Sequence, residues 1–354
     1  MAAAVTSKSL IAAYDPTPDT WGTQVAPGAL DLILPQSLGP LLPTSEMVPD
    51  PSAGYAWLQY IERCKENITP ELPFSMRWTG RLYSLMAQIM GVDTPAFSTP
   101  NCVHVMTMLE AIDGLDNFGT LAAQLGPAGS ELLFEWPSVK PTGFTIDGPD
   151  GSGYMNVTFR TIADTVNLGS DCTTATSDID DLTHIPLASA LPGIIPFGAL
   201  RFRMTTNVYG AFDADDELKV RHFTFTFNRN MGPEWTARAA VANAWQTEEP
   251  IEDGIPECTL MIELGDLNNL TQLERYQDGT AMKCEAYWQY GTNNYFKIEI
   301  PKMLPVVPEA SASGSSRIPQ TLNYMIMQAL ANPTGMAFAL PVITLADQSE
   351  PAYE

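Results

Sequence analysis

Apolar and polar residues alternate along several stretches of this chain, which is the pattern of a β-strand with one buried face. The clearest examples are Met155–Arg160, Leu200–Met204, Phe223–Asn228, Met282–Tyr290, Phe296–Ile300 and Val342–Leu345. Turn residues Gly291–Asn294 separate two of them, so Met282–Tyr290 and Phe296–Ile300 are expected to form a hairpin. The glycine-rich stretch Gly148–Gly153 is predicted to be a second hairpin turn. The chain is therefore predicted to be mainly β.

Helical spacing is confined to short segments. Leu82–Ile89 carries one apolar stripe, and Gly91 is well placed to end that helix. A weaker stripe runs through Leu267–Leu273 before Gly279, and a third helical segment is predicted through Trp57–Cys64. Each stripe is expected to pack on a sheet and not to bind a cofactor.

Two sequence patterns occur twice, in the same order. Pro70–Trp78 resembles Pro256–Leu264, and a predicted helix follows each of them. Glu135–Pro141 matches Glu299–Pro305 in its Glu-apolar-Pro order and its Pro-to-Pro spacing. The offset is 186 residues from Glu71 to Glu257 and 164 from Glu135 to Glu299, which predicts about 22 extra residues in the first copy. A repeat of this length indicates two fused copies of one small domain.

The 354 residues are enough for two domains with a core each. The polar stretch Gly169–Ser189 is the predicted linker. Residues 1–188 are then a first module with an insertion near 101–126, and residues 189–354 a second module. Each is expected to be a β-sandwich or flattened β-barrel with one short flanking helix. Three long excursions from the sheets are predicted, at Pro35–Ile68, Arg229–Ile255 and Pro308–Pro319.

Charge and composition narrow the classes of function. The net charge of −23 argues against binding of nucleic-acid phosphates, which requires clustered lysine and arginine. It suits plain solubility, or a surface that lies close to DNA without holding it. No apolar run reaches the length of a membrane-spanning helix. Because Met1–Lys8 lacks a signal-peptide pattern and the five cysteines are widely separated, we expect synthesis in the cytosol and reduced thiols.

Residues typical of catalysis or metal binding form no pattern in the sequence. None of His104, His184 and His222 has metal-ligand spacing to another, and nucleophile-elbow and phosphate-loop motifs are missing. The acidic runs Asp178–Asp181 and Asp213–Glu217 lack calcium-loop spacing and are expected to be solvated loops. No catalytic, cofactor-binding or metal site is predicted, no cofactor is expected, and the chain is not expected to be an enzyme.

The order of strands and turns is similar to that of a known structural family. The segments that carry the resemblance are Gly22–Pro27, Leu30–Leu34, Asp215–Phe227, Gly254–Ile262, Phe296–Pro301 and Ala339–Leu345. In this order the chain resembles the tail tube proteins (major tail proteins) of tailed bacteriophages, particularly those with long non-contractile tails. The resemblance covers most of the chain and is carried by pattern, since no invariant motif is present.

The resemblance implies modules that join their sheets around a ring, with rings stacked into a hollow tube that conducts the genome. A fused pair of modules would give a ring of three chains with pseudo-sixfold symmetry. The implied partners are other copies of the chain, the tail tip, tape measure and tail terminator proteins, and double-stranded DNA that passes without specific binding. No membrane insertion is implied. The implied location is the virion tail, after assembly in the host bacterial cytoplasm.

In such a tube the long excursions would make contacts between rings. Trp235 and Arg317 are then candidate assembly residues, because tryptophan and arginine are enriched at interface hot spots. The alternative for each is a locally packed tryptophan and a solvated arginine. Two alternative functions remain at this point. One is another viral β-protein of a capsid or its decoration. The other is a β-sandwich carbohydrate-binding protein or glycosidase, which would need a cleft with convergent acids and aromatic residues.

Overall fold

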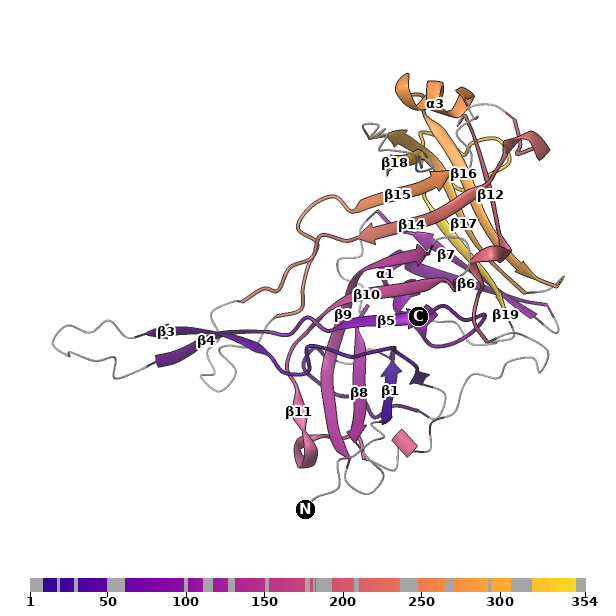
Figure 1. The fold of residues 1–354 in the computed structure, drawn as a ribbon. Helices are drawn as coiled ribbons and strands as arrows, with labels where there is room; N and C mark the ends of the chain where they lie inside the picture. Colours follow the sequence, from indigo (N-terminus) through magenta and orange to yellow (C-terminus); the bar gives the residue numbers. More distant parts are fainter. Residues whose placement is uncertain are drawn as a thin grey trace, which may run out of the picture.

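The computed structural model describes residues 9–17, 20–28, 31–49, 61–98, 101–110, 117–126, 131–149, 153–175, 179–180, 182, 193–206, 210–235, 248–264, 270–291, 294–306 and 320–347. In these residues the chain is mainly β, which confirms the predicted fold class (Figure 1). The first half contains β1 (Ser9–Asp15), β2 (Leu32–Ile33), β3 (Thr44–Pro49), β4 (Ile61–Asn67), β5 (Glu71–Ser75), β6 (Gly91–Ser98), β7 (Asn101–Met108), β8 (Gly119–Gly126), β9 (Leu132–Gly148), β10 (Asn156–Ala163) and β11 (Asn167–Leu168). The second half contains β12 (Leu200–Thr206), β13 (Glu217–Leu218), β14 (Val220–Asn228), β15 (Glu257–Leu264), β16 (Met282–Tyr290), β17 (Asn294–Pro305), β18 (Gln320–Ile326) and β19 (Val342–Asp347). The α-helices are α1 (Leu82–Met90) and α3 (Leu270–Gln277).

Helix α1 forms where its apolar stripe predicted it, and α3 begins within the predicted stripe Leu267–Leu273, of which residues 267–269 lie outside the described ones. Every residue of α1 is buried, and the helix ends at Gly91, whose φ of 109° lets its N–H reach the carbonyl of Ala87. The predicted helix through Trp57–Cys64 is wrong in its described part, because Ile61–Asn67 is strand β4, paired with β3. Residues 57–60 lie outside the described ones. So short an apolar stripe gains little as a helix without a sheet to pack on.

The same order of antiparallel strands occurs in both halves. In the first half the order is β1–β8–β9–β10–β5, with β2 beside β1. In the second half it is β12–β16–β17–β18–β15. The predicted hairpins β9–β10 and β16–β17 are therefore confirmed. In the two ladders β9–β10 is equivalent to β17–β18, and β16–β17 is equivalent to β8–β9.

The correspondence extends to single residue pairs. The pair Leu10–Leu125 of the first half is equivalent to the pair Leu200–Trp288 of the second. In the same way, Leu121–Trp136 is equivalent to Cys284–Ile300. The pair Ile162–Lys140 is equivalent to Met325–Leu304. Even the register irregularity recurs, after Gly119 in β8 and after Met282 in β16. The repeated Glu-apolar-Pro pattern is in register between the halves. The Pro70–Trp78 match is not, because Glu71 corresponds to Met261 in the ladders and not to Glu257.

Strands β6 and β7 have no counterpart among the described strands of the second half. The insertion was predicted near 101–126, and of these two strands only β7 lies in that range. Strand β8 also lies in that range, but it is not an insertion, because it corresponds to β16. Through β7 this hairpin pairs with β19 and so extends a layer of the second half. The predicted boundary between residues 188 and 189 lies outside the described residues, and the division into two modules stays a prediction.

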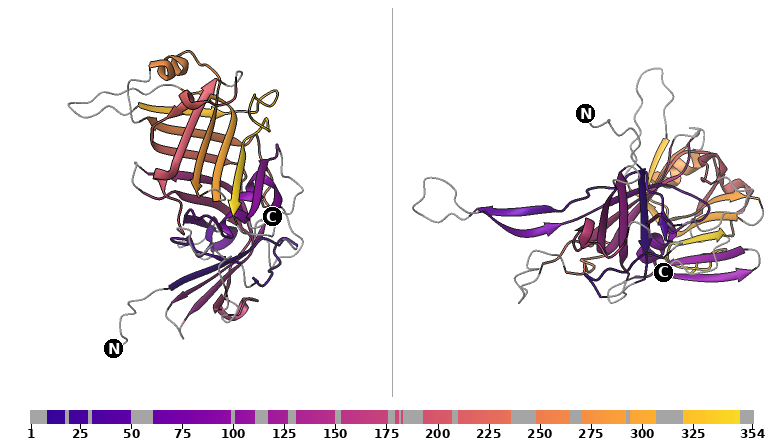
Figure 2. Two further views of the ribbon diagram at one scale, coloured as in Figure 1. Left: turned by 90° about the vertical axis from the view of Figure 1, so that its right-hand side faces the viewer. Right: turned by 90° about the horizontal axis from the view of Figure 1, so that it is seen from below.

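One sheet crosses from the first half into the second. Residues 143–147 of β9 pair with β10 on one side and with β14 on the other. The order β5–β10–β9–β14–β15–β18 is thus continuous, and we name it the shared sheet. In the left view of Figure 2, strands β12, β16, β17 and β19 cross in front of β14, β15 and β18 as a second layer. Aromatic side chains fill the space between the layers, with the rings of Phe223 and Trp288 5.5 Å apart.

Two arms leave the sheets on the same side of the molecule (Figures 1 and 2). The first arm is the hairpin β3–β4, between β2 and β5. The second arm comprises residues 229–235 and 248–256, between β14 and β15, joined by the bridges Met231–Glu252 and Glu234–Glu248. Each arm therefore precedes an equivalent strand, β5 or β15, in its half of the chain. The predicted excursions at Pro35–Ile68 and Arg229–Ile255 contain these arms.

Candidate functional site

The outer face of the shared sheet is a continuous surface built by both halves. Side chains alternate along a strand, so residues paired across neighbouring strands form rows on one face. One row consists of Pro73, Thr158, Thr145, Thr226 and Thr259. The next consists of Ser75, Asn156, Asp147, Thr224, Met261 and Asn323. We name these two rows the polar face.

The polar face follows from a strict alternation in the sequence. Thr224 and Thr226 in β14 are half-buried, whereas Phe223, Phe225 and Phe227 between them are buried in the core. Phe225 and Phe227 pack on Phe144 of β9, with ring centroids 5.8 Å and 5.9 Å away, and Phe223 packs on Trp288. The same aromatic contacts that form the core therefore orient the threonines outward, across the joint between the halves.

Hydrogen bonds join the two halves on the polar face. The hydroxyls of Thr145 and Thr226 lie 3.2 Å apart across the β9–β14 seam. Asp147 accepts a hydrogen bond of 2.8 Å from the hydroxyl of Thr224, and its carboxylate lies 2.9 Å from Nε2 of His222. This places His222 at the seam, in a strand, consistent with its sequence pattern.

Charges are sparse around the polar face. The carboxylates on the rows and their immediate neighbours are Glu71, Asp147, Glu257 and Glu263. Arg160 lies directly opposite Glu71, and Arg221 lies 3.6 Å from Glu263. Each arginine thus faces a glutamate, which leaves little unbalanced positive charge to hold a phosphate backbone. The surface is neutral to weakly acidic and rich in hydroxyl and amide groups.

On the inner side of the shared sheet, Arg229 of the second half forms hydrogen bonds to helix α1 of the first half. Its fully buried guanidinium donates to the carbonyls of Ile89, Met90 and Leu109 at 2.8–2.9 Å, and to Glu252 at 2.9 Å. Carbonyls at a helix C-terminus lack partners within the helix and carry partial negative charge, so a cation there is favourable. Arg229 therefore fixes both the end of α1 and the base of the second arm.

A second buried ionic group joins β6, β7 and β19. His104 Nδ1 lies 2.7 Å from Asp93, and its Nε2 lies 3.5 Å from Asp347. Burial alone lowers the pKa of His104, but the hydrogen bonds and charges of Asp347 and Asp93 raise it to about 9. The imidazole is therefore positively charged at neutral pH and holds the C-terminal strand to the β6–β7 hairpin.

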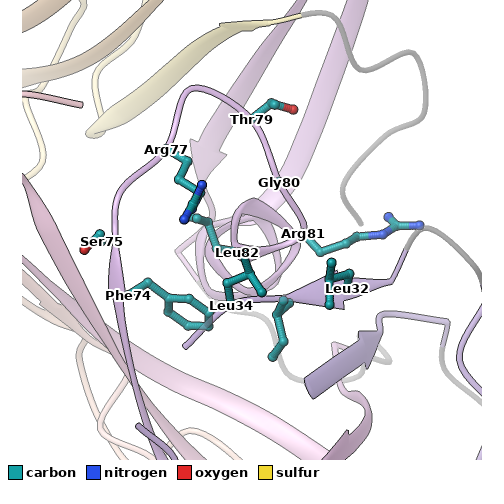
Figure 3. A pocket seen from close by; sticks show the side chains of 10 residues that line it. Leu32, Leu34, Phe74, Ser75, Arg77, Thr79, Gly80, Arg81 and Leu82 are labelled. Atoms are coloured by element: carbon teal, nitrogen blue, oxygen red, sulfur yellow. The ribbon is translucent and has the colours of Figure 1, made fainter. Parts of the chain in front are cut away.

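The described residues contain a small cavity and a more open recess. The cavity, of about 10 Å³, lies beside α1 and is lined by residues that include Leu32, Phe74 and Leu82 (Figure 3). It has room for at most one water molecule. The open recess, of about 610 Å³, lies between Thr20–Gln24 and Glu248–Glu249. It includes Trp21 and Asp164, so it is the place to test the carbohydrate-binding alternative.

The structure separates the residues that the sequence analysis singled out. Trp235 is half-buried in the second arm, whereas Arg317 and His184 lie outside the described residues. The run Asp213–Glu217 is exposed and forms a short capped turn. In the described part of the chain no three His, Cys, Asp or Glu side chains are grouped to hold a metal ion. Cys102, Cys258 and Cys284 are buried, and Cys172 is half-buried.

No protein-family model matches the chain. A search of curated proteins also gives no match. Function must therefore be argued from the polar face, the joint beneath it and the arms. Among the described residues, no helix is long and apolar enough to cross a membrane.

Two of these features leave no pattern in the sequence. Asp93 and His104 lie more than two hundred residues before Asp347, and no spacing pattern links them. The partners of Arg229 are mostly backbone carbonyls, which leave no mark in a sequence. The alternating threonines, by contrast, were visible as the polar positions of predicted strands, and their number on one face was the available signal.

Proposed function

We propose that this chain is a structural subunit of a phage tail tube, in which three chains form a pseudo-hexameric ring and rings stack around a lumen that conducts DNA. The observation that carries the proposal is the β9–β14 joint. There, the second half adds its edge strand to the sheet of the first, in register over Phe223–Asn228. A ring of repeated modules needs such a joint at every boundary between modules. The β9–β14 joint is the boundary that lies within one chain.

The repeated ladder supports two modules per chain, and so six modules in a ring of three chains. Because β1–β8–β9–β10–β5 and β12–β16–β17–β18–β15 have the same order and register, the halves present equivalent edges. A joint repeated between equivalent edges of successive chains closes a ring, and a closed ring leaves no strand edges open to uncontrolled pairing. On this proposal the halves are fused copies of one module.

The polar face is the surface that we assign to the lumen. Its hydroxyl and amide groups give DNA few fixed cations, since Arg160 and Arg221 each face a glutamate. A duplex sliding past such a wall would not be retained by phosphate contacts. The acids of the wall would be Glu71, Asp147, Glu257 and Glu263.

The two arms provide the contacts that we assign to stacking. Both project from the same side of the molecule, so every module of a ring would extend one arm in the same direction (Figure 1). Head-to-tail contacts of this kind build open filaments. Trp235 in the second arm stays a candidate contact residue. The other partners on this proposal are the tail tip, tape measure and tail terminator proteins, with the virion tail as the location.

Negative-stain electron microscopy of the concentrated protein, with its mass measured in solution, tests the proposal. Hollow tubes of stacked rings and a mass of three chains per ring are expected. Trp235→Asp, a substitution in the described part of the second arm, is the matched variant, and it should form rings that do not stack. Protein that stays monomeric, or that closes into shells even when seeded with tail tips, would contradict a tube and favour a capsid or decoration protein.

A further inference from the structure

Equivalent positions in the two ladders differ sharply in exposure. In the first half, Ser138, Lys140, Ile162 and Asp164 are all buried. Their equivalents in the second half are Lys302, Leu304, Met325 and Met327, because Ile162 pairs with Lys140 as Met325 pairs with Leu304. The bond from Asp164 N–H to the Ser138 carbonyl likewise matches the bond from Met327 to Lys302. Yet Met325 is 51% exposed and Met327 39% exposed.

The buried positions of the first half are covered partly by the second half. Glu249 of the second arm accepts a hydrogen bond of 2.6 Å from the buried ammonium of Lys140. Arg229, which directly follows β14, donates its backbone N–H to the carbonyl of Thr142 at 2.8 Å. The base of the second arm therefore seals this end of the first half's sheet. The loop at Gly22 covers the remainder, with its N–H bonded to Ser138.

The uncovered positions of the second half form an apolar patch at one edge of the shared sheet. Leu304 lies opposite Met325 on the same face, and Val306, the equivalent of Thr142, is 43% exposed beside them. We name Leu304, Val306, Met325 and Met327 the methionine patch. Here the polar face gives way to apolar side chains, which is typical of a surface that a partner covers.

The first half carries the equivalent of the element that seals such a patch. Residues Gln36–Gly39 lie beside β5 as β14 lies beside β15, through bonds from Gln36 N–H to Pro73 and from Glu71 N–H to Gly39. Gly39 is the equivalent of Thr224, because Gly39 pairs with Glu71 as Thr224 pairs with Met261, so Thr44 at the start of the first arm stands where Arg229 stands in the second half. We name residues 39–44 the base of the first arm. In it Leu42 is 53% exposed, and the arm projects away from its own second half (Figure 1).

We propose that the base of the first arm of a second copy, with Leu42 at its centre, covers the methionine patch. The contact is head-to-tail, since one copy supplies the arm and the other the patch. This inference rests on the proposed function in that it identifies the surface through which chains close the ring. The fusion of the halves supplies the equivalent contact within each chain.

Paired variants in the full chain test the contact. Met325→Asp/Met327→Asp removes the patch, Leu42→Asp removes the arm contact, and Leu132→Asp is the matched control on an exposed leucine at the far end of β9 (64% exposed). Native mass spectrometry should show closed oligomers for wild type and Leu132→Asp. The amount of closed oligomer should be at least tenfold lower for Met325→Asp/Met327→Asp and for Leu42→Asp. Unchanged circular dichroism and thermal unfolding establish that the variants fold. A mixture of the two defective variants should give one-to-one heterodimers, because one intact arm and one intact patch remain.

The outcomes separate this inference from the proposed function. Tubes formed by Met325→Asp/Met327→Asp as readily as by wild type would overturn the patch contact and leave the tube proposal intact. Closed three-chain rings that depend on the patch but never stack would support the contact and count against the tube. Wild type that never self-associates, with or without tail-tip seeds, would overturn both. A mixture without heterodimers would overturn the head-to-tail arrangement.

Discussion

Arg229 combines more structural roles than any other single side chain described above. It caps the last carbonyls of α1, neutralises Glu252 and lies over the ring of Phe227, 5.1 Å from its centroid. A guanidinium suits this place because its planar set of donors reaches several carbonyls at once. Removing it leaves a buried carboxylate and three carbonyls without their donor, which is costlier than the loss of an exposed ion pair.

Arg229→Met is therefore expected to lower the free energy of unfolding by about 3–5 kcal/mol, measured by urea denaturation. Arg201→Met, which removes an exposed pair with Glu217, is the control and should change it by about 1 kcal/mol or less. Adding Glu252→Gln to Arg229→Met should recover part of the loss, since the buried charge disappears. Equal effects at Arg229 and Arg201 would contradict the assigned role.

His104 makes stability depend on pH in a defined direction. Its pKa is about 9 in the folded protein and 6.5 as the reference value for the unfolded chain, so the folded state binds more protons between these limits. The charged groups that face it are Asp93 on β6 and Asp347 on β19, and the hydroxyl of Tyr83 on α1 lies near Asp347. The stabilisation is complete below pH 6.5 and is lost as pH rises toward 9.

Across this window the free energy of unfolding of wild type should fall by an amount on the order of 3 kcal/mol, and that of His104→Gln should stay nearly flat. The measurement is urea denaturation at several pH values. The series stops before the pH at which buried thiols such as Cys258 ionise when the chain unfolds. An identical slope in His104→Gln would show that other groups cause the dependence.

At the scale of elements, helix α1 depends on its terminal glycine. Gly91 has a φ of 109°, a conformation that side chains rarely adopt, and its N–H closes the last turn on Ala87. The helix lies at the centre of the first half's core, so strain there is transmitted to β6, which begins at the same residue.

Gly91→Ala should destabilise the protein by about 1–2 kcal/mol through backbone strain. Gly198→Ala should have almost no effect, because an added Cβ at Gly198 meets no atom within 4 Å and its φ is not positive. Thermal unfolding followed by circular dichroism compares the two variants. Similar melting temperatures would contradict the strained conformation at Gly91.

The sequence predicted helices and strands well wherever a segment had both a clear hydrophobic period and turn or stop residues at its end. The β16–β17 hairpin and the end of α1 at Gly91 are examples, since turn residues and glycine act locally. Strand β4 was misassigned because its hairpin with β3 stands apart from the core, so apolar periodicity carried no information there. The repeat was detected, but the Pro-Glu match was out of register, because two residue types recur more easily by chance than a whole ladder does.

Contacts between distant segments could not be predicted from the sequence. The pairing of β9 with β14 depends on which edges meet after both halves have folded, and alternation alone does not choose a partner strand. The polar face could be anticipated strand by strand, but its continuity across the halves could not.

On the scale of the whole molecule, the charge is acidic overall, whereas the polar face is nearly neutral. A chain with 41 acidic and 18 basic residues repels DNA at long range. On the polar face, Thr158 and Thr226 carry no positive charge to hold a phosphate, so on the proposed function the face would let a duplex pass.

Thr158→Lys/Thr226→Lys should convert the face into a DNA-retaining surface. The affinity for a fluorescent duplex should rise at least tenfold at low salt and fall steeply as salt is added. Leu132→Lys adds charge away from the face and is the control for general charge effects. Fluorescence anisotropy gives the affinities. Tight, salt-sensitive binding by the wild-type protein would contradict a face that does not hold DNA.

The most direct test of the account is a cryo-electron microscopy reconstruction of the assembled protein. The account predicts rings of three chains with pseudo-sixfold symmetry, in which Thr158, Thr145 and Thr226 face a central channel wide enough for duplex DNA. The methionine patch should lie at the boundary between neighbouring chains. A reconstruction in which these threonines face outward, or in which the assembly encloses no channel, would contradict it.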